Sequence, residues 1–186
     1  MLSSKLAFAN LIIILSILAC QNTIIGSEAT PPPADIYLDL RNTWLTTKPE
    51  DLALTFEPGS KVPYAILMDM GIDGDTATIA SSIVGDGSLL TSTGGGYIGG
   101  VEVENVRQAS IRFVEVSGGF IDRMKLTTEF PLPSSGYIRF YVITPGGVYM
   151  TDEVKQIDLS LGSHELSPLY FAGDDVITEL RIASGG

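Results

Sequence analysis

Cysteine and histidine are almost absent from this sequence. Its 186 residues include one Cys and one His. A single cysteine excludes an internal disulfide framework and a multi-thiolate zinc site, and a single histidine leaves no second imidazole for a His-pair metal centre. Most familiar catalytic constellations are therefore missing, and the sequence predicts neither a bound metal nor a cofactor.

Basic residues are also scarce. Eleven Lys and Arg stand against 22 Asp and Glu, which gives a formal net charge of −11 and a pI near 4.3. Nucleic-acid binding depends on clustered Lys and Arg that meet the phosphate backbone, so nucleic acid is not expected as a partner. The chain is nevertheless 45% hydrophobic, which is too apolar for a disordered protein.

The apolar run at the N-terminus is too short for a permanent membrane span. Lys5 precedes an uncharged apolar core at residues 11–19. As a helix this core would cover about 14 Å of a hydrocarbon layer about 30 Å thick. The layout is typical of a cleaved export signal, and Cys20, the only cysteine, follows the core directly.

Residues 17–20, ILAC, resemble the lipobox of bacterial lipoproteins, in which an apolar residue and a small residue precede a cysteine that is acylated and becomes the new N-terminus. The resemblance implies lipidation of Cys20. Because Gln21 and not Asp follows, it also implies anchoring in the outer membrane, facing the periplasm. The alternative is an ordinary signal peptide cleaved after Ala29, which would give a secreted or periplasmic soluble protein.

The sequence divides into three parts. Residues 1–19 are the predicted signal peptide, residues 20–34 a lipid-anchored tether that contains the run Pro31-Pro32-Pro33, and residues 35–186 one folded domain. About 150 residues is an ordinary size for a single domain, and no repeat divides it. A body this acidic is not attracted to anionic lipid, so tethering by a lipid is the consistent arrangement.

Hydrophobic patterning predicts an α+β domain. The expected elements are a short helix (35–45), a three-stranded meander with Asp-Gly turns (64–70, 76–84, 88–92), a long helix (103–124), a hairpin (137–143, 148–150), a short helix capped by residues 151–153 and ending near 162, and a C-terminal helix opening at Ser167-Pro168. Strands joined by tight hairpins cannot be parallel neighbours. We therefore expect an antiparallel sheet of about five strands with helices packed on it, compatible with a profilin-like or roadblock-like sandwich.

A glycine-rich loop at residues 94–100, GGGYIGG, is the best candidate for a ligand site. It matches GxGxxG between a predicted strand and a predicted helix, where backbone amides and the helix dipole can hold an anion. Hairpin-joined strands argue against a dinucleotide fold, and a structural turn explains the same glycines. The candidate ligand-binding residues are Gly94, Gly95, Gly96, Tyr97, Gly99 and Gly100.

Two further patterns are less specific. Asp69, Asp73 and Asp75 have the spacing of part of a calcium loop but lack its other ligands, and a hairpin turn accounts for them. His164 follows Ser163 without the GxSxG elbow of a hydrolase, and adjacent side chains cannot ordinarily form a nucleophile and base. No catalytic or metal-binding residue is assigned.

Several segments of the body resemble a family of uncharacterised bacterial proteins. They are residues 92–100, 130–133, 139–141 and 164–169. These motifs have no established chemical role, so the resemblance implies no catalytic residue. It favours a self-contained domain attached to a lipoprotein-type signal.

These features predict a lipid-tethered cell-envelope protein that acts as a non-enzymatic binding module for another protein or a small ligand. An inhibitor or immunity-type lipoprotein that neutralises a secreted toxin or hydrolase fits its size, anchor and acidity. The alternative is a small enzyme or ligand-binding protein that uses loop 94–100 as an anion site, with an acid from Asp69, Asp73 or Asp75 nearby.

Native mass spectrometry of the protein extracted gently from its own membranes tests the anchor. Lipidation predicts a chain that begins at Cys20 and carries acyl groups. A chain that begins at Thr30 and carries no lipid would contradict the lipoprotein interpretation.

Overall fold

The fold is built around an eight-stranded sheet. The structure is a computed structural model that describes residues 35–185, so the predicted signal, Cys20 and the tether lie outside the described residues. Within residues 35–185, no helix is long and apolar enough to cross a membrane. All strand pairs are antiparallel and helices pack on the sheet, which confirms the predicted α+β class.

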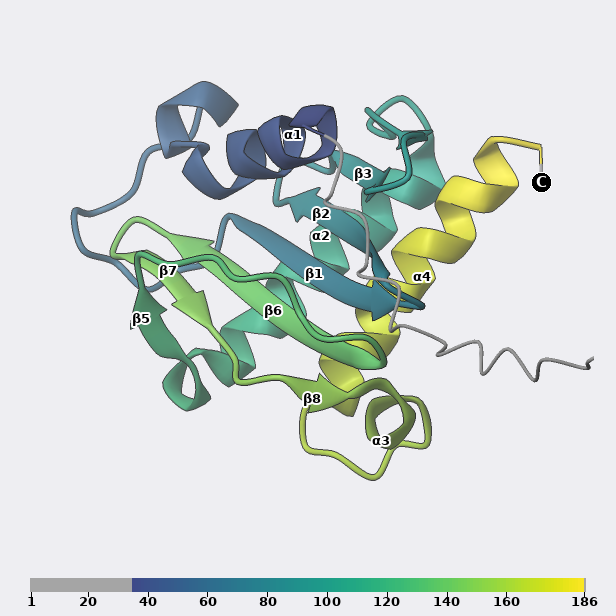
Figure 1. Cartoon of the computed structure of the whole chain (residues 1–186). Helices are drawn as coiled ribbons and strands as arrows, with labels where there is room; N and C mark the ends of the chain where they lie inside the picture. Colours follow the sequence, from purple (N-terminus) through teal and green to yellow (C-terminus); the bar gives the residue numbers. More distant parts are fainter. Residues whose placement is uncertain (1–34, 186) are drawn as a thin grey trace, which may run out of the picture.

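Helices and short 3₁₀ turns connect the strands (Figure 1). The helical elements are α1 (Asp35–Thr46), η1 (Pro49–Leu52), α2 (Glu104–Ser117), η2 (Gly118–Arg123), α3 (Gln156–Ser160) and α4 (Ser167–Ala183). The strands are β1 (Ala65–Ile72), β2 (Asp75–Ser82), β3 (Gly87–Thr91), β4 (Gly96–Tyr97), β5 (Lys125–Thr127), β6 (Tyr137–Thr144), β7 (Gly147–Met150) and β8 (Val154–Lys155). The sheet order is β4-β3-β2-β1-β6-β7-β5, and β8 pairs with β6.

The first hairpin forms where the Asp-Gly signal predicts it. Asp73 and Gly74 have φ values of 44° and 93°, the left-handed conformation that a tight hairpin turn requires. Ile72 pairs with Asp75 directly beside this turn. Local sequence therefore sets the register of β1 against β2.

The first and last helices lie where the sequence predicts helices. α1 extends from Asp35, the first described residue, to Thr46, one residue beyond the predicted end. α4 starts at Ser167 with Pro168 in its first turn, where a missing N–H costs nothing. Both helices can therefore be located from local signals alone.

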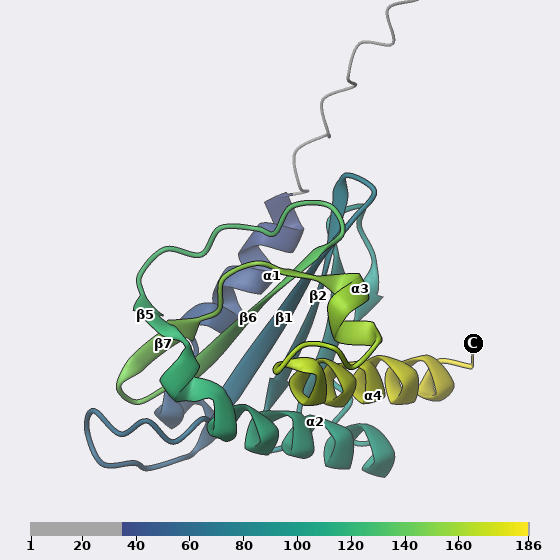
Figure 2. The same cartoon turned by 90° about the horizontal axis from the view of Figure 1, so that it is seen from below.

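Residues alternate between two faces along the central strand β1. Ile66, Met68 and Met70 join the core beneath α2 and α4, whereas Ala65 and Leu67 join a second core on the opposite face. Figure 2 shows the sheet between α1 on one side and α2 with α4 on the other. Because both faces are covered, β1 is a nearly continuous apolar run.

The predicted helix over residues 103–124 is divided in two. α2 ends at Ser117, and the chain continues as the 3₁₀ turn η2 from Gly118. Glycine has a low helix propensity, so the pair of glycines ends the regular helix. Val106 and Phe113 of α2 are fully buried between the helix and the sheet.

The sheet has more strands than the five or so that the sequence predicted. The additional strands β4, β5 and β8 contain two or three residues each. A segment of that length shows no measurable alternation of apolar and polar residues. Its pairing depends on the neighbouring strand that tertiary folding supplies.

The predicted helix cap at residues 151–153 was wrong. Thr151 is buried, and its Oγ1 accepts a hydrogen bond of 3.1 Å from the backbone N–H of Phe140. The next residues form β8, and α3 begins only at Gln156. A threonine that satisfies a buried strand amide is not free to cap a helix.

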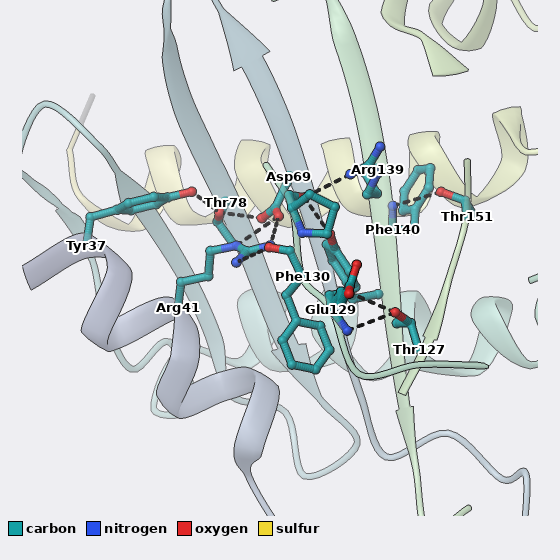
Figure 3. A network of polar contacts seen from close by, with 12 residues as sticks. Tyr37, Arg41, Asp69, Thr78, Thr127, Glu129, Phe130, Arg139, Phe140 and Thr151 are labelled. Atoms are coloured by element: carbon teal, nitrogen blue, oxygen red, sulfur yellow. Dashed lines mark hydrogen bonds and ion pairs between the residues drawn. The ribbon is translucent and has the colours of Figure 1, made fainter. Parts of the chain in front are cut away.

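A buried ion pair fastens α1 to the sheet. Arg41 of α1 donates from Nε to Oδ2 of Asp69 on β1 over 2.9 Å, and its Nη2 donates to the same oxygen (Figure 3). Arg41 is 5% exposed and Asp69 is 0% exposed, so each charge depends on the other. Burial alone would lower the pKa of Arg41, but the adjacent carboxylate outweighs this and raises it.

Two hydroxyl groups complete this network. Thr78 on β2 donates from Oγ1 to Oδ1 of Asp69 over 2.6 Å. Because the Thr78 proton is used there, the hydroxyl of Tyr37 on α1 donates to Thr78 over 2.8 Å. Burial raises the pKa of Tyr37 and the Asp69 carboxylate raises it further, so this hydroxyl stays protonated.

The same arginine also holds the loop before β6. Arg41 Nη1 donates to the backbone carbonyl of Phe130 over 3.1 Å, and the guanidinium lies 5.2 Å from the ring centre of Tyr141. The Tyr141 hydroxyl and Arg139 Nη1 both donate to the carbonyl of Pro131, over 2.6 Å and 3.0 Å. The Arg41 guanidinium therefore connects α1, the central sheet and the loop before β6.

Asp69→Ala is expected to lower the free energy of unfolding by about 3–5 kcal/mol, because the Arg41 charge would stay buried without a partner. Asp122→Ala is the matched control. Asp122 pairs with Lys61 over 3.2 Å, but its side chain is 92% exposed, so we expect a loss below about 1 kcal/mol. Urea unfolding followed by circular dichroism measures both, and equal losses would contradict the role of the buried pair.

Candidate functional site

The predicted glycine loop folds back along β3. Thr91 donates its backbone N–H to the carbonyl of Gly95 over 3.3 Å, and Gly96 and Tyr97 form β4. Gly96 has a φ of 136°, and a Cβ at this position would overlap the carbonyl oxygen of Leu89. Only glycine allows this close approach between the two strands.

The loop does not run directly into a helix N-terminus. Gly100 donates its N–H to the carbonyl of Gly87 over 3.1 Å, and α2 begins four residues later at Glu104. Glu102 and Glu104 add carboxylates at this end of α2. An anion at the helix end would meet these negative charges, so the geometry does not favour the predicted anion site.

An apolar pocket of about 250 Å³ lies between α1 and the β3–β4 hairpin. We call it the α1 pocket. Its lining residues are Ile36, Tyr37, Leu40, Leu90, Thr91, Gly94, Gly95, Gly96 and Ile98. Ile36 and Ile98 are 65% and 69% exposed, whereas Tyr37 is buried. The pocket is therefore bordered by the exposed apolar side chains of Ile36 and Ile98 and backed by the buried ring of Tyr37.

A second pocket of about 340 Å³ adjoins the same loop beside α2 and α4. We call it the α4 pocket. It is lined by Tyr97, Ile98, Gly99, Gly100, Val103, Val106, Leu180, Ala183 and Ser184. Ile98 lines both pockets. The segment that contains β4 thus has an apolar depression on either side.

Acidic residues neighbour the lining residues in sequence, although none of them lines either pocket. Asp35 and Asp39 lie one turn apart on α1, next to residues that line the α1 pocket. Asp75 accepts a hydrogen bond of 3.1 Å from the hydroxyl of Ser92, two residues before the loop, and the exposed Glu102 precedes Val103 of the α4 pocket. We call Asp35, Asp39, Asp75 and Glu102 the acidic rim. Hydrogen bonds from Arg107 and Gln108 lower the pKa of the neighbouring Glu104 and keep it charged.

Tyr37 contributes its ring to the α1 pocket but not its hydroxyl. That hydroxyl is engaged with Thr78 inside the core, and Tyr37 is 2% exposed. Its raised pKa excludes a phenolate at neutral pH. The pocket therefore offers a surface for packing and no reactive oxygen from this residue.

The three acids of the incomplete calcium loop do not converge. Asp69 is buried against Arg41, Asp73 occupies the turn, and only Asp75 lies near the glycine loop through its contact with Ser92. Among residues 35–185, no group of three or more His, Cys, Asp or Glu side chains could hold a metal ion.

His164 and Ser163 have structural contacts before α4. The Ser163 hydroxyl donates to the carbonyl of Asp158 over 2.9 Å, and His164 Nδ1 accepts the N–H of Leu166 over 3.1 Å. The two side chains thus bond to backbone groups in different directions. The arrangement stabilises the loop and does not join a nucleophile to a base.

Sequence reasoning located the loop but missed the surfaces that flank it. Ile36 and Leu40, which stand one turn apart on α1, complete the α1 pocket, and Leu180 of α4 completes the other. The only local signal is that Ile36 is an apolar residue outside the buried face of its helix. Which loop such a residue meets depends on the path of the whole chain.

Comparisons with protein-family models, with curated proteins and with solved structures found no match. Membership of the uncharacterised family stays a prediction.

Gly96→Ala is expected to lower the free energy of unfolding by about 1–3 kcal/mol, because of its positive φ and the overlap with Leu89. Gly119→Ala is the control, since nothing lies within 4 Å of a Cβ placed there. We expect its effect to stay within about 0.5 kcal/mol. Chemical unfolding measures both variants, and a Gly96→Ala protein as stable as the parent would show that β4 is not constrained in this way.

Proposed function

We propose that the protein is a non-enzymatic binding module of the bacterial cell envelope, tethered through a lipid on Cys20, that binds another protein. The observation that carries the proposal is the pair of apolar pockets beside the β4 segment, with acidic residues next to their lining residues in sequence. We call the two pockets, the β4 segment and the acidic rim the binding face.

Exposed apolar side chains support protein binding at this face. Four apolar side chains within residues 97–103 are between 38% and 69% exposed: Tyr97, Ile98, Val101 and Val103. Ile36 lies across the α1 pocket from this segment. Burying apolar surface gains about 25 cal/mol per Å². An apolar centre with a polar rim is the usual anatomy of a protein interface.

The acidic residues at the binding face favour a cationic partner. Asp35, Asp39, Asp75 and Glu102 repel an anionic ligand and attract a cationic surface. No Lys or Arg lines either pocket. The anion-binding alternative is therefore the weaker proposal.

Three titratable side chains of the described residues have hydrogen-bond partners outside the binding face. Asp69 is held by Arg41, Tyr37 by Thr78, and the ring of His164 accepts a backbone N–H. A general acid or base needs a proton-transfer group that can reach substrate. This supports binding over catalysis.

The tether supports the same proposal. Ile36 of α1, which follows the predicted tether at residues 20–34 closely in sequence, belongs to the binding face. Fifteen residues would span about 20 Å if they behaved as a random coil. A lipid on Cys20 would thus hold a captured partner close to the membrane surface.

Site-specific photocrosslinking in cells tests the binding face. Ile98→p-benzoylphenylalanine is expected to give a discrete crosslinked protein, because Ile98 lies between the two pockets. Leu161→p-benzoylphenylalanine is the control, since Leu161 is 73% exposed and lines neither pocket. Adding Ile36→Asp should abolish the crosslink at position 98. Identical products at both positions, or a crosslink that survives Ile36→Asp, would refute the proposal.

A further inference from the structure

We infer that the partner binds as an extended basic segment that adds a strand to the free edge of β4. This inference rests on the proposed function and specifies its binding mode and the chemistry of the ligand. Three observations carry it: the unpaired strand edge, the pockets on both sides of it, and the negative charge around it.

The backbone of β4 is available for pairing. β4 is the last strand of the sheet path and pairs only with β3 in the described residues. In an antiparallel ladder, alternate residues direct their N–H and C=O groups toward and away from the neighbouring strand. Pairing with β3 therefore leaves backbone groups of this segment pointing to the open side, as in other sheets that bind peptide strands.

The two ends of the sheet are protected differently. The opposite end is β5, where Lys125 pairs with Asp152 over 2.7 Å. A lysine on an edge strand is a common device against unwanted pairing. β4 consists of Gly96 and Tyr97 and carries no charge. The β4 edge is thus the one that lacks this protection.

The pockets suit the alternation of an extended strand. Successive side chains of a strand point to opposite faces of the sheet. The α1 pocket and the α4 pocket lie on either side of the segment around Ile98. Neighbouring apolar side chains of an added strand would therefore enter different pockets.

The glycines allow the backbone of a partner to come close. A Cβ at Gly94 or Gly99 would meet nothing within 4 Å, so the space beside these residues is open. Bare backbone at a sheet edge accommodates a strand better than a helix, whose side chains keep its axis at a distance.

The acidic rim specifies basic residues in the added segment. Asp35 and Asp39 stand on the α1 side, and Glu102 on the side of the α4 pocket. A second copy of this chain would bring the same acids to the same place, which is unfavourable. A foreign segment with an apolar centre and flanking Lys or Arg complements both the pockets and the charge.

The probe is the labelled, end-blocked peptide Lys-Lys-Val-Leu-Val-Lys-Lys, titrated by fluorescence anisotropy against the full mature chain in detergent. We expect saturable binding that weakens with salt. In an added strand, one set of alternate peptide amides would donate hydrogen bonds to β4, and the other set would point away from it. N-methylation of the first set removes those hydrogen bonds and should weaken binding about tenfold. N-methylation of the second set should leave the affinity unchanged.

Matched protein variants locate the binding. Ile98→Asp and Glu102→Lys should each weaken binding by about tenfold, through the pockets and the charge respectively. Glu115→Lys is the control for charge, because Glu115 is exposed on α2 and lines neither pocket. Thermal unfolding confirms that the variants fold.

The outcomes separate this inference from the proposed function. If N-methylation of either set of alternate peptide amides has the same effect on affinity while Ile98→Asp abolishes binding, strand addition is wrong and the binding face stands. If the crosslink at position 98 depends on Ile36 but the peptide does not bind, the partner is not an extended basic segment. Sedimentation showing a dimer that Ile98→Asp dissociates would replace the foreign segment by a second copy and overturn the inference.

Discussion

The buried contact between Arg41 and Asp69 is the constraint on which the rest of this structure depends. A carboxylate in the middle of a central strand is tolerated only when a cation and hydrogen-bond donors reach it. Arg41 meets that requirement from α1, and Thr78 meets it from the neighbouring strand. The position of α1 over the sheet is therefore tied to one charge, and with it Tyr37, which forms the inner wall of the α1 pocket.

Because both faces of the sheet are covered, a ligand can reach the strands mainly at the edges of the sheet. α1, together with Leu52, Leu54, Phe56 and Phe130, covers one face, and α2 with α4 covers the other, so few side chains of the central strands are open to a ligand. One open part is the segment around β4, where glycine replaces side chains and Ile98 stands between two apolar pockets. The glycines that resemble a phosphate loop in the sequence serve a different physical purpose here. They let two strands approach closely and leave backbone exposed.

Charge and anchoring give the proposal its direction. The net charge of −11 leaves the body without attraction to anionic lipid, whereas the predicted lipid on Cys20 would hold it at the membrane. The same acidity, placed around an apolar centre, favours a basic protein segment over a phosphate or nucleotide. The proposal thus places anchoring and recognition in separate parts of the chain.

Local sequence determined the longer elements of this protein, and tertiary structure decided the short strands and how the elements meet. The Asp73-Gly74 turn, the start of α4 at Ser167 and the α+β class follow from neighbouring residues, because backbone conformation and hydrophobic periodicity are short-range properties. The short strands, the engagement of Thr151 with Phe140 and the Arg41–Asp69 pair, 28 residues apart, do not. Likewise, nothing in the neighbourhood of Ile36 indicates that it shares a pocket with Ile98. Such contacts join residues distant in sequence, and only the folded path of the chain brings them together.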